Sequence, residues 1–509
     1  MSWLTTAGPI TCSRDTAKTT DADLLVFPWF DAEPAAAVPG LDEASGGDIG
    51  RALQGREFSG KPFEVYFTTL GDGSWQTRRA AIIGAGPRTG FGTLQARRVA
   101  TAAGLAARSR RYARMAFVCR GSSDVLSPGA WMDVGQATAE GLVLAEFHSG
   151  RFKTSEPPPP VPRWTMVAEG APPEILAAIN RGRILGDCSN RARALTNEPG
   201  NMLGPRAFAA QIAALVEDAG IRAEILEPSE LERLRMGLLL GVAQGSAEPP
   251  RVVVLRYEPA GATGPVLGLV GKGITFDTGG ISIKPAEAMD RMKDDMAGGA
   301  AVAAAMRAIG LIGAPIRVLG VIPIAENMPS GTAIRPGDVL TSAEGKTVEI
   351  INTDAEGRLI LGDALWYARQ LGATHLVDVA TLTGAVVVAL GKITSGVFGR
   401  PERWVEQVRR VGDAAGDPMW PLPMFDEYRE QLKSEIADVA NTGGRPAGSI
   451  TAAMFLKEFT GGLPWVHLDI AGTAWAEDAR PYQPKGATGV AVRTLARLAI
   501  DAARWRDDE

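Results

Sequence analysis

The chain contains little histidine for its length, and this shortage narrows the metal chemistry that it can carry. Only His148, His375 and His467 occur in 509 residues, so neither an HExxH motif nor a zinc site of three clustered histidines is predicted. His375 and His467 adjoin apolar, strand-like runs and are interpreted as hydrogen-bonded core residues. A metal ion in this protein would therefore be held mainly by oxygen ligands.

Cysteine is also scarce, which excludes a disulfide framework and a thiolate zinc site. Cys12, Cys119 and Cys188 are far apart and form no CxxC pair, as is typical of a reducing compartment. Residues 1–7 lack the basic and apolar parts of a signal peptide, and no run approaches the roughly 18 apolar residues of a membrane span. A net charge of -5 argues against general nucleic-acid binding but leaves a local basic patch open. We expect a cytoplasmic protein without membrane contact.

The length of the chain exceeds what one hydrophobic core usually serves, so two domains are expected. In the first third, apolar runs at 24–27, 80–83 and 115–118 alternate with helical patterns at 98–107 and 134–147. This alternation predicts a small amino-terminal α/β domain. The segment 84–86 lacks the third glycine of a dinucleotide-binding loop and is interpreted as an ordinary loop.

A proline-rich stretch at 156–162 predicts an extended linker. A helical pattern over 173–196 follows it and could bridge two domains, and Pro205 favours the start of the next helix. We therefore expect an amino-terminal domain over 1–160, a linker and bridging helix over 161–200, and a second domain over 201–509. The second domain is predicted to be a three-layer α/β/α unit with a mixed, largely parallel central sheet, on strands at 252–255, 266–270, 318–322, 348–351, 376–379 and 466–470.

Two carboxylates, a glycine and a guanidinium follow the strand-like run 348–351. Asp354 and Glu356 stand two residues apart in what is predicted to be a non-helical turn, where their oxygens can converge on one divalent cation. Arg358 stays protonated and cannot ligate a metal, so it is interpreted as a handle for an anion or for developing negative charge. A surface loop with a salt bridge is the alternative.

A second polar cluster follows the apolar run 266–270. The glycines at 271, 273, 279 and 280 free the backbone for positive φ angles and for close approach. They are expected to shape a loop at the carboxyl end of a strand, where open α/β sheets bind ligands. Lys272 and Asp277 lie inside this cluster, and an ordinary ion pair in a loop is the alternative interpretation for them. Lys284 and several aspartates come next, followed by a helix of small residues from 297.

The two clusters belong to a series of blocks that resembles the cytosol (leucyl) aminopeptidase family of dinuclear metallopeptidases. The blocks occur in one order over roughly residues 190–490, at 270–277, 279–284, 295–296, 325–329, 335–338, 352–359, 380–385 and 467–472. The amino-terminal third carries no such motif, and its membership is inferred only from its attachment.

The resemblance implies a set of metal ligands. Asp277 and Glu356 would bridge two divalent ions, Asp354 would complete the first site, and Lys272 with Asp295 would complete the second. Lys272 would have to be neutral to ligate, which lysine can achieve and arginine cannot. Asp294 has a nearly equal claim to that of Asp295 on sequence grounds; Asp295 is chosen because the family's ligand immediately precedes a methionine.

The resemblance also implies catalytic and substrate-binding residues. Lys284 would stay charged and stabilise the gem-diolate, and Arg358 would hold a bicarbonate that relays the proton. The remaining residues would bind the substrate, three through backbone contacts (Thr381, Leu382 and Gly384) and three by lining the pocket for its first side chain (Met292, Ala471 and Ala474). Relatives often carry methionine where this chain has Ala474, which leaves the side-chain preference open.

The implied activity is hydrolytic removal of amino-terminal residues, leucine and other apolar residues preferred, from peptides. Two Mn²⁺ or Zn²⁺ ions per subunit would activate a bridging hydroxide, with bicarbonate as a further cofactor, and the protein would be a homohexamer. A two-metal phosphoesterase is the first alternative, but it would call for several histidines or a phosphate-binding loop. DNA binding by the assembled oligomer, through the amino-terminal domain, is the second alternative and stays open.

Overall fold

The computed structural model describes residues 9–121, 126–155, 160–161 and 163–502. The start of the chain, expected to lack a signal peptide, and most of the predicted linker at 156–162 lie outside these residues. Contacts divide the chain into two compact units. One runs to Asn190 and adds Asp478–Lys485, and the other comprises Arg191–Glu477 and the residues from Gly486 onward. The predicted limits at 160 and 200 stay a prediction.

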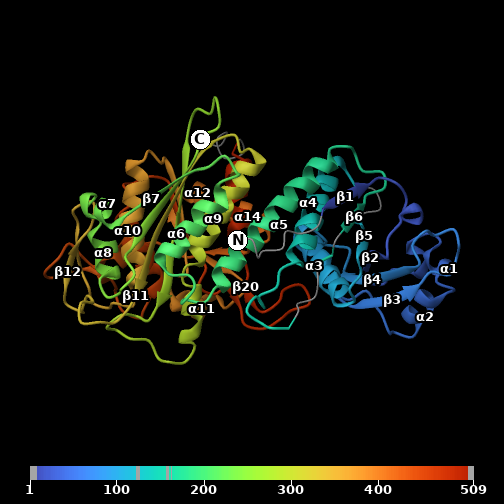
Figure 1. Cartoon of the computed structure of the whole chain (residues 1–509), viewed down its shortest axis with the longest axis horizontal. Coiled ribbons are helices and arrows are strands. Elements are labelled where there is room, and N and C mark those ends of the chain that lie inside the picture. The colour runs from blue at the N-terminus through green and yellow to red at the C-terminus, as the bar shows by residue number, and fades with distance from the viewer. Residues whose placement is uncertain (1–8, 122–125, 156–159, 162, 503–509) are drawn as a thin grey trace. The chain divides into compact units, whose positions relative to one another are not determined.

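The amino-terminal unit is built on a six-stranded sheet with the order β1-β6-β5-β2-β4-β3 (Figure 1). All its pairs are parallel except β3 with β4, and this confirms the predicted α/β class. The strands are β1 (Ile10–Ser13), β2 (Leu24–Phe30), β3 (Val65–Thr69), β4 (Arg79–Gly86), β5 (Arg114–Val118) and β6 (Arg163–Val167), and the helices are α1 (Leu41–Ala44), α2 (Asp48–Gln54), α3 (Thr93–Ser109) and α4 (Pro128–Leu144).

The loop predicted at 84–86 was wrong, because these residues end strand β4. Gly84 pairs with Trp29 of β2, and a Cβ on Gly84 would lie 1.8 Å from the backbone oxygen of Lys61. Because glycine has no Cβ, the backbone at Lys61 can approach the strand closely at this position.

The second unit is built on a nine-stranded mixed sheet with the order β16-β15-β18-β14-β9-β11-β8-β7, with β10 paired to β11. Its centre is parallel, and β8, β7 and β15 add antiparallel pairs. The strands are β7 (Arg222–Leu226), β8 (Arg251–Tyr257), β9 (Val266–Gly271), β10 (Gly273–Asp277), β11 (Arg317–Asn327), β14 (His375–Ala380), β15 (Ser395–Arg400), β16 (Met419–Pro421) and β18 (Trp465–Asp469).

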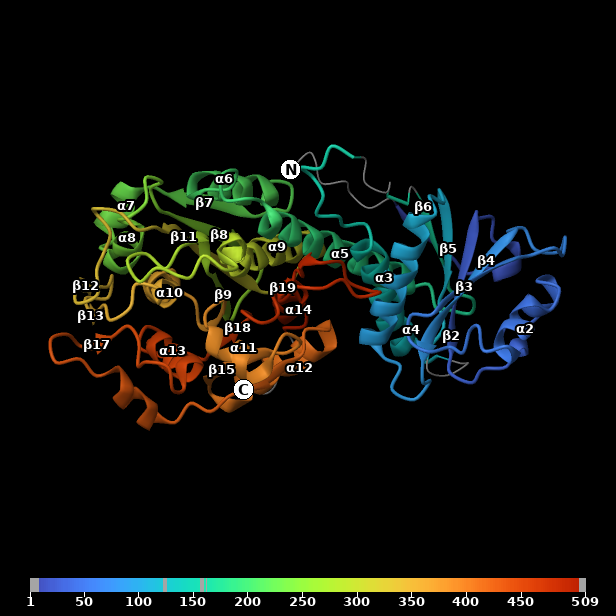
Figure 2. The same ribbon diagram turned by 90° about the horizontal axis from the view of Figure 1, so that it is seen from below.

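Helices cover this sheet in two groups that can be followed in Figures 1 and 2. One group packs α9 against α6 and α14, and α14 against α12; the other packs α10 against α8 and α13. The three-layer prediction is therefore confirmed. The helices of this unit are α6 (Pro205–Val216), α7 (Pro228–Arg233), α8 (Gly237–Ala243), α9 (Ala297–Ile312), α10 (Glu356–Gln370), α11 (Gly384–Leu390), α12 (Glu402–Ala415), α13 (Gly448–Lys457) and α14 (Val492–Ile500). Helix α5 (Ile175–Asn197) belongs to the amino-terminal unit up to Asn190 and to the second unit from Arg191.

Five of the six strands predicted for the second domain lie in the main sheet, but the run at 348–351 does not. Its residues form β13 (Thr347–Glu349) in a separate small sheet with β12 (Val339–Thr341) and β17 (Val439–Ala440). In β13 only Val348 is buried and its neighbours are half-exposed, so this strand has one covered face and is not a central strand. A two-stranded ribbon of β19 (Trp475–Ala476) and β20 (Gly486–Ala487) completes the unit.

Within the described residues one helical segment, Met289–Ile312, is long and apolar enough to cross a membrane. Its most apolar window is 83% buried inside the protein. The small side chains of α9, from Ala297 to Ala305, let the neighbouring strands approach closely. We interpret the segment as a core helix.

Candidate metal centre and substrate cavity

Three acidic side chains meet at one edge of the main sheet. Asp277 ends β10, Asp354 lies in the turn before α10, and Glu356 is the first residue of α10. One ligand oxygen from each lies within 4.8 Å of the others. Glu356 is therefore helical, and only Asp354 lies in the expected non-helical turn. Glu356 Oε2 is buried and accepts no hydrogen bond from any described residue, as fits an oxygen that can ligate a metal ion.

Asp277 is held in place by hydrogen bonds from two sides. Its Oδ1 accepts from the amide of Gly279 and from Asn327 Nδ2, both at 2.8 Å. Gly279 and Gly280 have φ angles of +87° and +65°, as expected for a tight loop. The expectation of a loop was wrong for Gly271 and Gly273, which end β9 and begin β10.

Gly271 serves a close approach of backbones. A Cβ on Gly271 would lie 2.6 Å from the backbone oxygen of Gly298 in α9. The first turn of α9 therefore packs directly on the strand end that carries Lys272.

Lys272 reaches two acids from the junction of β9 and β10. Its Nζ lies 2.8 Å from the carboxylate of Asp295 and 2.8 Å from Glu356 Oε1, and it donates to the backbone oxygen of Thr381 at 3.0 Å. The side chain is 3% exposed. Burial lowers the pKa of Lys272, but the surrounding carboxylates outweigh burial and raise it above its usual value.

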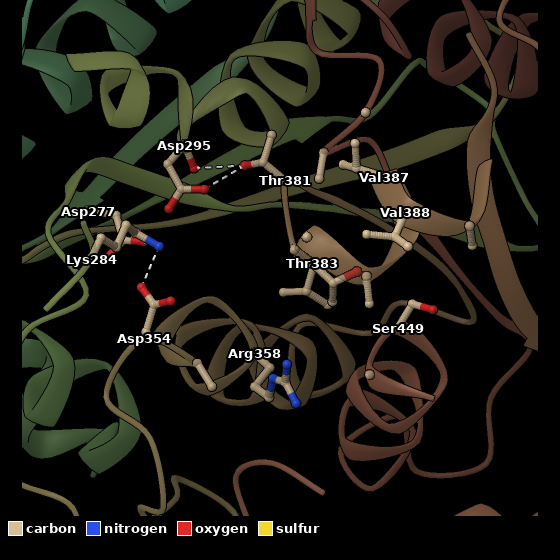
Figure 3. A pocket seen from close by; sticks show the side chains of 18 of the residues that line it. Asp277, Lys284, Asp295, Asp354, Arg358, Thr381, Thr383, Val387, Val388 and Ser449 are labelled. Carbon is tan, nitrogen blue, oxygen red and sulfur yellow. Dashed lines mark hydrogen bonds and ion pairs between the residues drawn. The ribbon is translucent and has the colours of Figure 1, made fainter. Parts of the chain in front are cut away.

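Lys284 approaches the acidic cluster from the cavity. Its Nζ lies 2.8 Å from Asp277 Oδ2 and also forms an ion pair with Asp354 (Figure 3). Its side chain is 22% exposed, in contrast to that of Lys272. Burial again lowers the pKa, while Asp277, Glu356 and Asp354 raise it. The two lysines thus meet the acidic cluster in different environments.

The structure separates the two neighbouring aspartates that the sequence left nearly equivalent. Asp295 Oδ1 accepts from Thr381 Oγ1 at 2.8 Å and from Lys272. Asp294 lines the cavity and makes neither contact, and burial raises its pKa to about 7. Asp295 is therefore the aspartate that the fold brings to Lys272 and Glu356.

Arg358 lies on α10 and is only 7% exposed. Its Nη1 donates to the backbone oxygen of Asn441 at 2.9 Å, and its buried Nε has no hydrogen-bond partner in the described part of the chain. Burial lowers the pKa of Arg358 to about 10.

Asn441 was missed by the sequence reasoning, because no motif marks it. Its side chain hydrogen-bonds the backbone of Ile351 and Asn352 and so holds the loop that carries Asp354.

A cavity of about 980 Å³ opens beside the acidic cluster. Five of the six predicted substrate-binding residues line it, namely Met292, Thr381, Leu382, Gly384 and Ala471. Ala474, the sixth predicted residue, is not among the described residues that line the cavity, and the next residue, Trp475, lines it instead. Ala474 is only 3% exposed, and its amide donates a hydrogen bond to the backbone oxygen of Ile470. The reason is the turn after β18, which directs Ala474 into the core.

Two histidines are core residues, as predicted. His467 is fully buried with Nδ1 2.6 Å from Asp378 Oδ1, and His375 is buried with Nδ1 3.1 Å from Thr374 Oγ1. The sequence reasoning missed a group of cavity residues that belong to no recognisable motif: Arg291, Lys392, Thr442, Arg445, Ser449, Trp475 and Glu477.

Comparisons with known proteins agree with this geometry. Residues 190–496 match the cytosol aminopeptidase family, catalytic domain, and residues 25–156 match the N-terminal domain of the same family. A probable cytosol aminopeptidase of Solibacter usitatus is 46% identical over 493 residues, which cover 97% of this chain and 99% of that protein. A probable cytosol aminopeptidase of Koribacter versatilis is 46% identical over 465 residues, covering 88% and 90%.

Solved structures give the same result. A mutant of tomato leucine aminopeptidase superposes with a TM-score of 0.89 at 32% identity, covering 98% of this chain and 97% of that one. The bottromycin maturation enzyme BotP in complex with Mn superposes with a TM-score of 0.84 at 34% identity, covering 95% and 100%. Both domains are therefore matched, and the chain belongs to the cytosol aminopeptidase family of peptidases.

Proposed function

We propose that this aminopeptidase is metal-dependent and removes leucine and other apolar residues from the amino termini of peptides. The observation that carries the proposal is the cluster of buried Asp277 and Glu356 with the half-buried Asp354, which opens into a cavity large enough for a short peptide. Buried carboxylates are costly unless cations neutralise them, and here Lys272 and Lys284 pair with them. Met292, Leu382 and Ala471 give part of the cavity an apolar wall, which fits an apolar first side chain.

The residues fit two divalent cations, Mn²⁺ or Zn²⁺. Asp277 and Glu356 would bridge the ions, Asp354 would complete one site, and Lys272 with Asp295 would complete the other. When bound, the ions would supply Lewis-acid activation of water and of the peptide carbonyl near neutral pH. The carboxylates around Lys272 favour its ammonium form, so binding of a cation there must release the proton.

Lys284 and Arg358 supply the charges that the reaction needs. The partly exposed ammonium of Lys284 faces the cavity, where it would stabilise negative charge developing on the carbonyl oxygen. The resemblance to the family implies that Arg358 would hold bicarbonate as the carrier of the proton. Its Nε, which has no partner among the residues described, leaves a donor for such an anion. The backbone of Thr381, Leu382 and Gly384 would align the peptide.

The test is hydrolysis of a panel of amino-acid amides by enzyme stripped of metal and then supplied with Mn²⁺ or Zn²⁺. Activity should disappear on chelation and return with metal. Asp277→Ala and Glu356→Ala should each abolish turnover, because each removes a ligand shared by both ions. Asp426→Ala, at an aspartate whose side chain is 79% exposed, is the matched control. Turnover near that of the parent enzyme in either site variant would refute the proposal.

We also propose a homohexamer in the cytoplasm, without membrane contact. The resemblance to the family implies the hexamer, and the naming of relatives as cytosol aminopeptidases supports the location. The family match favours peptidase over phosphoesterase chemistry. DNA binding gains no support from any feature described above.

A further inference from the structure

Arg445 is the exposed cation of the cavity wall to which the described residues offer no anionic partner. Lys272 and Lys284 are engaged by the acidic cluster, as described above. Arg291 Nη1 lies 2.6 Å from Glu477 Oε1, and Lys392 forms an ion pair with the other oxygen of the same carboxylate. Arg358 is buried on α10.

Arg445 is exposed to solvent, and the described residues offer it neither an ion pair nor a hydrogen bond. It is thus a free guanidinium at the wall of a cavity in which the other exposed cations are neutralised. Since an arginine binds a carboxylate through two parallel N–H donors, this position is suited to a carboxylate brought by a ligand.

The loop that carries Arg445 has a defined shape. Gly444 has a φ angle of +88° and its amide donates to Thr442 Oγ1 at 3.2 Å. Ala447, at the start of α13, has a φ angle of +54°, which is uncommon for a residue with a side chain. Pro446 between them removes further freedom. The backbone at Arg445 is therefore held in place while its side chain stays free.

Packing of α13 on α11 sets the distance of this loop from the substrate backbone. A Cβ on Gly448, the first residue of α13, would lie 3.2 Å from the Cβ of Ala385 in α11. Thr381, Leu382 and Gly384, which would align the peptide, directly precede Ala385. Figure 3 shows Ser449 of α13 on the side of the cavity away from Asp277 and Lys284.

We propose that Arg445 binds the terminal carboxylate of the substrate and so makes dipeptides and tripeptides with a free carboxyl terminus the preferred substrate class. This inference rests on the proposed function, which puts the amino terminus of the peptide at the acidic cluster. A peptide extended from there toward α13 advances about 3.3–3.6 Å per residue, and its remaining charged group is the carboxylate. An arginine with several rotatable bonds can meet that group at more than one peptide length.

The experiment compares kcat/KM for leucylglycine with that for leucylglycinamide, in which a neutral amide of similar size replaces the terminal carboxylate. The parent enzyme should prefer the free acid. Arg445→Gln should reduce this preference by up to roughly fivefold, the upper end expected for one exposed charge pair. Arg445→Glu should reverse it in favour of the amide. Arg403→Gln, at an exposed arginine on α12 outside the cavity lining, is the matched control and should keep the parental ratio.

Equal kcat/KM for the two substrates in the parent enzyme, or an equal loss on both substrates in Arg445→Gln, would overturn the inference. Because each variant is compared with itself on two substrates, a partial loss of folded protein cancels from the ratio. Failure of the proposed function has a different signature, since neither substrate would then be hydrolysed by the metal-loaded parent enzyme.

Discussion

Gly357 is the position at which a single methyl group should disable the site while the fold survives. A Cβ at Gly357 would lie 2.6 Å from Cε and 2.7 Å from Nζ of Lys272. Carbon atoms in contact prefer about 3.5–4.0 Å, so Gly357→Ala should push the lysine amine away by roughly 1 Å. The amine now lies 2.8 Å from both Asp295 and Glu356. After the displacement at least one of these separations should exceed hydrogen-bonding distance.

The effect on activity should be much larger than the effect on stability. A displacement of about 1 Å at a reacting centre can cost about 10²-fold in rate, and a misplaced Lys272 should also weaken the second metal site. The fold should change little, because the obstructing atoms are the end of a flexible side chain and alanine in α10 gains roughly 0.5–1 kcal/mol over glycine. We expect Tm to stay within about 4 °C of the parent value.

The assay combines kcat/KM on leucine amide, bound metal per subunit by elemental analysis, and Tm. Gly129→Ala is the matched control, since this glycine of α4 has open space around the added methyl group. Parental activity and metal content in folded Gly357→Ala would refute the reasoning, because it would show that the position of Lys272 does not matter. A large fall in Tm would show instead that the lysine cannot move aside.

Three further predictions follow from the same structure. Lys284→Arg preserves charge and should keep measurable activity and full metal content, whereas Lys272→Arg cannot ligate and should lose the second ion; elemental analysis showing full occupancy in both would contradict the ligand role of Lys272. Burial raises the pKa of Glu458, but hydrogen bonds from Arg429 and Lys346 outweigh burial and leave the pKa below its usual 4.5. A depressed carboxyl pKa stabilises the fold above about pH 4.5 and loses that contribution as the pH falls through the folded-state pKa. Glu458→Gln should therefore lower Tm at pH 7 and flatten its fall below pH 4.5, and parallel Tm curves for the two proteins would contradict the ion-pair network. Finally, sedimentation of the active enzyme at micromolar concentration should show a hexamer, and a monomer would count against the assembly.

The sequence could predict the fold class and the chemistry of the site because both depend on short-range patterns. An apolar run such as 266–270 predicts a central strand. The residues that follow such a run lie at the carboxyl end of the strand, where open α/β sheets bind ligands. Lys272 and Asp277 follow such a run, whereas the run before Asp354 and Glu356 forms β13 of a separate small sheet. The role of these residues as metal ligands came from the resemblance of their blocks to a known family. The small number of histidines, a property of the composition, indicated that oxygen ligands would hold a metal ion.

Other features depend on which segments meet in space, and no local pattern encodes that. Asp295, unlike Asp294, accepts a hydrogen bond from Thr381, a residue far away in the sequence. The turn after β18 buries Ala474 in the core, away from the cavity. Gly84 looked like a loop residue because its real constraint is the distant backbone of Lys61. No sequence pattern marked Arg445, because an arginine between glycine and proline is common in loops. Only the packing of α13 on α11 places this loop at the wall of the cavity. The sequence by itself determined which reactive groups are present; the tertiary structure decided which of them are buried together and which remain free, because burial and pairing arise only from contacts between distant segments.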